Sequence, residues 1–328
     1  MTMRCLIAIG VVSMCASARS PDGTLGALQL PNNARPAMVC AGSAFVVEAQ
    51  QRGELRLAGE SAQFPLAPEW QDAARGTVRA SVTVPAEIPA GAYSLEWTQG
   101  DEGDRNTRAV YVLAAAAERD PYSQQYTFAC IALAMDSGQA GSAANASNTI
   151  NATQAQFAIV FVSGPEDRFG DLLTTLDACA VPTVVVADAP ESVCNRWFGP
   201  GTFAFQYGPD GFIAPAAGRA GLGDDLGPVA GQIAQLRQAN KTARWTVGLF
   251  AGPNAAMSTR NEITLFVDDT IHACIYGFVD DKAPPAKLPA WAGWFEPPRV
   301  FAVTKGRATI FAANRKNIAI EKSAVPQR

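Results

Sequence analysis

Residues Phe157-Ala-Ile-Val-Phe-Val-Ser-Gly164 form an apolar run that stops at a glycine. Its short length and its β-branched and aromatic content indicate a buried strand that ends in a loop. Four more runs of this kind occur in the second two-thirds of the chain. They are Phe128-Ala-Cys-Ile-Ala-Leu-Ala134, Val181-Pro-Thr-Val-Val-Val-Ala-Asp-Ala-Pro190, Trp245-Thr-Val-Gly-Leu-Phe-Ala-Gly-Pro253 and Ala273-Cys-Ile-Tyr-Gly-Phe-Val-Asp280.

Helical patterns lie between these strand-like runs. Phe169, Leu172, Leu173 and Leu176 fall on one face of a helix, and a second apolar face is formed by Ile263, Phe266 and Val267. This alternation predicts sheets covered by helices, which is an α/β domain. Phe301–Val303 and Ala308–Phe311, joined through Lys305-Gly306, predict a closing hairpin.

In order and spacing, the five runs resemble the metal-binding segments of the calcineurin-like metallophosphoesterase superfamily. Those segments carry Asp-x-His, Gly-Asp, Gly-Asn-His-Asp, a lone His and Gly-His-x-His. The resemblance covers roughly residues 125 to 315 and includes the connecting segments. Phe198–Gly208 and Gly211–Ile213 resemble a strand pair of the family. Val229, Ile233 and Leu236 resemble its amphipathic helix. It implies two packed sheets with flanking helices and a cleft at the strand ends.

The positions that would hold the metals carry other residues. Leu133 and Met135 replace the first Asp and His, and Pro165 replaces the bridging Asp. Asp188, Ala189 and Pro190 replace Asn, His and Asp, Ala251 replaces the lone His, and Phe278 and Asp280 replace the last two His. The chain has a single histidine, His272, inside a strand-like run. We therefore expect no transition metal, no cofactor and no catalysis.

Carboxylates near the same loops leave an alternative open. Oxygen ligands alone can hold Ca²⁺ or Mg²⁺. Weak cation binding would use Asp136, Glu166, Asp167, Asp188 and Asp280, and a phosphoesterase with such a rewired, oxygen-only site is the alternative function.

The first residues have the features of a secretion signal. Arg4 precedes the apolar stretch Cys5–Met14, and Ala16-Ser-Ala18 supplies a small-x-small cleavage site. We expect a signal peptide over residues 1–18 and an exported protein that is periplasmic, extracellular or on the cell surface. A lipid anchor on Cys15 is the alternative to cleavage. No later run reaches the length of a transmembrane helix.

Five cysteines remain after cleavage, so at least one is unpaired. Cys130 and Cys274 lie within apolar runs and are expected to be buried thiols. Cys179 and Cys194 flank a strand, and they are the candidates for a disulfide in an oxidising compartment.

The residues that precede the α/β part have a different sequence pattern. The runs are short, mostly alternate apolar and polar residues, and cover residues 44–48, 54–57, 78–84, 93–97 and 108–113. They predict a β-sandwich. Ile88-Pro-Ala-Gly-Ala-Tyr-Ser-Leu95 resembles the approach to a late strand of immunoglobulin-like domains. The expected organisation is a sandwich at 27–115, a linker, a metallophosphoesterase-like domain at 121–316 and a tail at 317–328.

The composition limits the classes of function that the chain could have. The net charge is −4, with no basic block, which disfavours nucleic-acid partners. The sequence thus predicts a non-catalytic, exported pseudo-phosphoesterase that serves as a structural or binding subunit and contacts other protein subunits. A free adhesive or carbohydrate-contacting surface protein is a further alternative.

Overall fold

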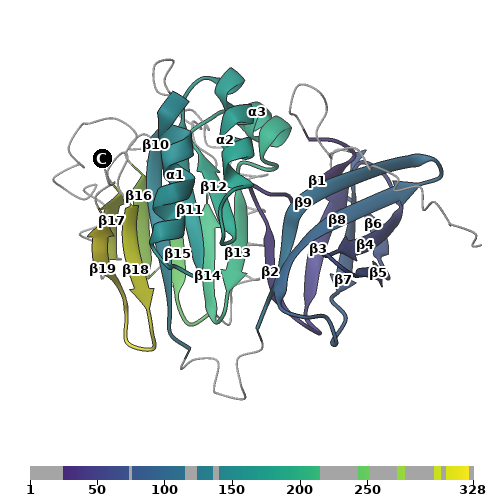
Figure 1. Cartoon of the computed structure of the whole chain (residues 1–328), viewed down its shortest axis with the longest axis horizontal. Coiled ribbons are helices and arrows are strands. Elements are labelled where there is room, and N and C mark those ends of the chain that lie inside the picture. Colours follow the sequence, from purple (N-terminus) through teal and green to yellow (C-terminus); the bar gives the residue numbers. More distant parts are fainter. Residues whose placement is uncertain are drawn as a thin grey trace, which may run out of the picture.

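A computed structural model describes residues 25–73, 76–114, 124–135, 140–214, 243–251, 272–277, 299–303 and 308–324. This part of the chain contains four β-sheets, packed as two pairs (Figure 1). It is mostly β-structure with few helices. The arrangement is that of a multidomain chain in which an all-β part precedes a mixed α/β part.

The first pair of sheets is a sandwich built from residues before 114. One sheet has the order β1 (Leu28–Leu30), β3 (Ala44–Ala49), β7 (Val78–Thr83) and β6 (Glu69–Asp72). The other has the order β2 (Ala37–Cys40), β9 (Glu102–Leu113), β8 (Gly91–Gln99), β4 (Glu54–Ala58) and β5 (Gln63–Leu66). All pairings are antiparallel except that of β2 with β9.

Alternation explains the sandwich core. In β7, Val78, Ala80 and Val82 are buried while the residues between them are exposed, because successive side chains of a strand point to opposite faces. The inward side chains of both sheets form one hydrophobic cluster that includes Leu57 and Trp97. Four of the five alternating runs predicted from the sequence lie within strands of this sandwich, and the run 78–84 extends one residue beyond β7.

The second pair of sheets forms the α/β domain. One sheet has the order β12 (Thr183–Ala187), β11 (Phe157–Ser163), β10 (Tyr126–Ala134), β18 (Ala308–Ala313) and β19 (Ile318–Ala324). The other has the order β13 (Phe203–Tyr207), β14 (Asp210–Ala214), β15 (Thr246–Phe250), β16 (Ala273–Gly277) and β17 (Arg299–Val303). Strands β10 to β12 are parallel, as are β14 to β17.

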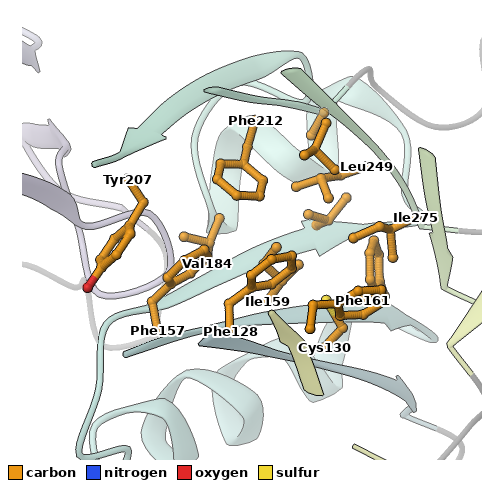
Figure 2. Close-up of a cluster of buried hydrophobic side chains, with 14 of the residues drawn as sticks. Phe128, Cys130, Phe157, Ile159, Phe161, Val184, Tyr207, Phe212, Leu249 and Ile275 are labelled. Carbon is orange, nitrogen blue, oxygen red and sulfur yellow. The ribbon is translucent and has the colours of Figure 1, made fainter. Parts of the chain in front are cut away.

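An aromatic core joins the two sheets of this domain. Figure 2 shows Phe128, Phe157 and Phe161 of one sheet facing Phe212 and other residues of the second sheet. The Phe128 and Phe157 rings stack at 5.2 Å, and each meets the Phe212 ring edge-on at 5.5 Å. Aromatic side chains bury large apolar areas, which makes this cluster a main source of stability.

Helices cover the outer face of β10, β11 and β12. They are α1 (Ala140–Ala152), the short 3₁₀ helix η3 (Glu166–Arg168), α2 (Phe169–Leu176) and α3 (Glu191–Trp197). The predicted apolar face of α2 is confirmed, because Phe169, Leu172, Leu173 and Leu176 are all buried. The amphipathic segments predicted around Val229 and Ile263 lie outside the described residues.

Two sequence-based expectations at the end of the chain need correction. Phe301–Val303 and Ala308–Phe311 do not pair as a hairpin: β17 pairs with β16 in one sheet, and β18 pairs with β10 in the other. The hairpin is formed instead by β18 and β19. Most of the expected tail at 317–328 is therefore strand β19, and its Ile318 is buried in the core between the sheets.

The sandwich and the α/β domain are joined by a strap, residues 25–36. The Leu25 N–H donates to the Arg196 carbonyl (3.0 Å), and the Val185 N–H of edge strand β12 donates to the Ala34 carbonyl (2.8 Å). The Asn32 side chain donates to the Phe198 carbonyl. The strap thus covers an edge that would otherwise present unpaired backbone groups.

Two arginines also cross between the domains. Arg35 stacks on the Phe203 ring, 3.8 Å from its centroid, and donates to the Pro200 carbonyl. Burial lowers the pKa of Arg35 to about 10. Arg108 donates to the Cys179 carbonyl at 2.7 Å. Guanidinium groups can satisfy carbonyls while stacking on rings, so the junction is polar and still closely packed.

Candidate functional site

The carboxyl ends of β10, β11 and β12 meet at one edge of their sheet. The Met135 N–H donates to the Ser163 carbonyl (2.8 Å), and the Asp188 N–H donates to the Val162 carbonyl (2.7 Å). Open α/β sheets commonly bind ligands beyond such strand ends. This edge is therefore the candidate site, and it contains the first three expected metal-ligand segments.

Apolar side chains fill this edge. Leu133, Met135 and Ala189 are buried, with exposed fractions of 3%, 5% and 7%, and they belong to the cluster between the sheet and its helices. Ala251 at the end of β15 is also buried, but in the separate cluster between the two sheets. Pro165 is exposed. Phe278 and Asp280 lie outside the described residues.

Two glycines show how closely the chain packs here. Gly164 has φ 137°, and a Cβ at this position would lie 2.8 Å from the Cβ of Met135. A Cβ on Gly277, at the end of β16, would overlap the Phe161 side chain of the opposite sheet. Both positions therefore require glycine.

The carboxylates at this edge that the structure describes are Glu166, Asp167 and Asp188. Glu166 is held by other side chains: its Oε1 accepts from Arg196 (2.6 Å) and from the Trp197 indole N–H (2.8 Å). Asp167 is exposed and Asp188 is half-buried. Asp136 and Asp280 lie outside the described residues. In the part of the chain that is described, no three His, Cys, Asp or Glu side chains form a group that could hold a metal ion.

The expected disulfide between Cys179 and Cys194 is not formed, because both residues are free thiols. Each is buried within the helix-side cluster. Burial raises the pKa of Cys194 to about 11 and also raises the pKa of Cys179. Both thiols are therefore protonated at neutral pH, and neither has the character of a reactive cysteine.

His272 lies away from this edge. It directly precedes β16, at the amino end of the strand, and not inside it as the sequence suggested. Its imidazole Nδ1 accepts from the Thr246 backbone N–H (3.0 Å), and the His272 backbone N–H donates to the Thr246 carbonyl (2.9 Å). The imidazole therefore extends the pairing of β15 and β16 and takes no part in the candidate site.

Sequence reasoning missed a buried ionic network near the amino ends of β10, β14 and β15. Arg244 donates to Asp210 through Nε (3.0 Å) and Nη2 (2.6 Å), and Tyr126 donates to the same carboxylate at 2.7 Å. The Trp245 N–H completes the set at 3.1 Å. Burial, with the Asp210 charge, raises the pKa of Tyr126 well above its ordinary value.

This network joins the two sheets, because Tyr126 begins β10 in one sheet and Asp210 begins β14 in the other. Only the turn Gly208-Pro-Asp210-Gly211 was visible in sequence, and a turn aspartate does not reveal a distant partner. The network is fully paired, so its role is structural.

Comparison with known proteins adds little at the sequence level. No protein-family model matches the chain, and no curated protein matches it. One similar solved structure is the purple acid phosphatase PPD1 from yellow lupin (Lupinus luteus) seeds, with 8% identity, a TM-score of 0.46, and coverage of 87% of this chain and 70% of that one. Another is the amylomaltase of Corynebacterium glutamicum, with 14% identity, a TM-score of 0.22, and coverage of 40% and 21%. At these TM-scores neither likeness establishes a shared fold.

Proposed function

We propose that this chain is a non-catalytic, exported pseudo-phosphoesterase that acts as a structural or binding subunit of an extracytoplasmic protein assembly. One observation carries the proposal: Leu133, Met135 and Ala189 occupy expected ligand positions and are part of the hydrophobic core. A dimetal centre needs imidazole and carboxylate donors that converge around the ions. Here the same positions hold apolar side chains that stabilise the fold.

The metallophosphoesterase-like assignment draws support from topology. Two five-stranded mixed sheets pack on each other, and helices α1 to α3 cover the outer face of one. The strand pair expected after the third segment corresponds to β13 and β14, which are antiparallel neighbours. Fold similarity alone does not assign a function, so the proposal depends on the state of the strand ends.

The immunoglobulin-like assignment of the sandwich has two supports. The order of strands, β1-β3-β7-β6 against β2-β9-β8-β4-β5, corresponds to the two sheets of that fold. Tyr93, near the start of β8, donates through its hydroxyl to the Pro89 carbonyl at 2.9 Å. A tyrosine that bonds back to the backbone just upstream is a feature of these domains.

Export is proposed from the leader-like residues 1–18, which lie outside the described residues. In the described part of the chain, no helix has the length and apolar character needed to cross a membrane. The partner subunits are inferred from export and from strand ends whose expected ligand positions hold core side chains.

The test is elemental analysis of the purified protein together with a generic phosphatase assay. We expect no stoichiometric Zn²⁺, Mn²⁺ or Fe, and no hydrolysis of phosphomonoesters or phosphodiesters above a blank. Stoichiometric transition metal, or turnover that a chelator abolishes, would refute the proposal. Turnover that requires only Mg²⁺ or Ca²⁺ would establish the alternative, an oxygen-only site.

The structural role is tested by mild purification from the extracytoplasmic fraction. A stable particle of defined subunits is expected, whereas a monomer would contradict the role. Deleting residues 27–115 is a poor probe of assembly. It would remove Ala34, Met38 and Tyr111 from the core clusters of the α/β domain and expose that core. Point substitutions on the sandwich surface are the sharper probe.

A further inference from the structure

We draw no further inference here: the strongest candidate, the outer edge of strand β19 with its exposed Ile320 side chain, carries none because nothing in the described part of the chain shows what covers that edge.

Discussion

At the scale of single residues, charge burial decides which substitutions matter most. Asp210 is fully buried and accepts four hydrogen bonds, of which the one from Tyr126 crosses to the other sheet of the α/β domain. By contrast, the Arg168–Asp171 pair on the helical surface spans 3.5 Å, and the Asp171 side chain is 66% exposed. Solvent screens the second pair and cannot reach the first.

Asp210→Ala should lower the free energy of unfolding by about 3–5 kcal/mol, because it leaves the buried Arg244 without its counter-ion. The control Asp171→Ala should change it by no more than about 1 kcal/mol. Urea denaturation of the two variants measures both values. If the two losses are similar, the Asp210 network does not hold the sheets together as described.

The single histidine makes a pH dependence assignable. Burial lowers the pKa of His272, and the nearby Asp210 opposes this only in part. The unfolded chain therefore binds a proton at higher pH than the folded chain does. The stability that His272 contributes is present above the ordinary pKa of about 6.5 and is lost as the pH falls through the folded-state pKa.

The urea midpoint should accordingly fall between pH 7 and pH 5.5 by more in the wild type than in His272→Asn. Asparagine keeps an acceptor for the Thr246 N–H but does not titrate. The difference between the two proteins isolates His272 from all carboxylates. Identical pH profiles would show that the imidazole is not coupled to folding.

At the scale of secondary-structure elements, the sequence pattern predicted a helix or a strand well where a single apolar face or a single apolar run determines it. All five apolar runs contain a strand, and the α2 face is buried as its spacing requires. The pairing of the strands was harder to predict from the sequence. Lys305-Gly306 indicated a turn, but a turn signal does not tell whether the flanking strands pair or enter different sheets. The strap was not foreseen, because Asn32-Asn33-Ala34-Arg35 has no periodicity and its partners lie more than a hundred residues away.

The candidate site was likewise predictable only where the local sequence is sufficient. Leu133, Met135 and Ala189 are visible in the sequence, and none of them offers the imidazole or carboxylate donor that a dimetal centre needs. Their division from Ala251 into two separate core clusters depends on the packing of two sheets, which no spacing reveals. The ion pairs of Glu96 with Arg56 and Arg105 were also not predicted, since the three residues lie on three strands and become neighbours only through their register.

At the scale of the whole molecule, the two domains share their cores. Ala34 of the strap is packed in the helix-side cluster, and Met38 and Tyr111 are packed in the cluster between the sheets. Domains that move independently have few contacts across a boundary. Here unfolding of the sandwich would expose apolar side chains of the α/β domain and release the backbone groups that bind Arg35 and Arg108.

We therefore expect the chain to unfold in one cooperative transition, with a ratio of calorimetric to van't Hoff enthalpy of about one. The variant Ala34→Asp places a charge in the helix-side core at the junction and should lower the transition temperature and separate the transition into two. The control Val46→Asp, at a side chain that is 53% exposed on the sandwich, should leave a single transition. Differential scanning calorimetry of the three proteins decides the matter. Two transitions in the wild type would mean that the shared residues do not couple the domains, and the sandwich would then unfold independently of the α/β domain.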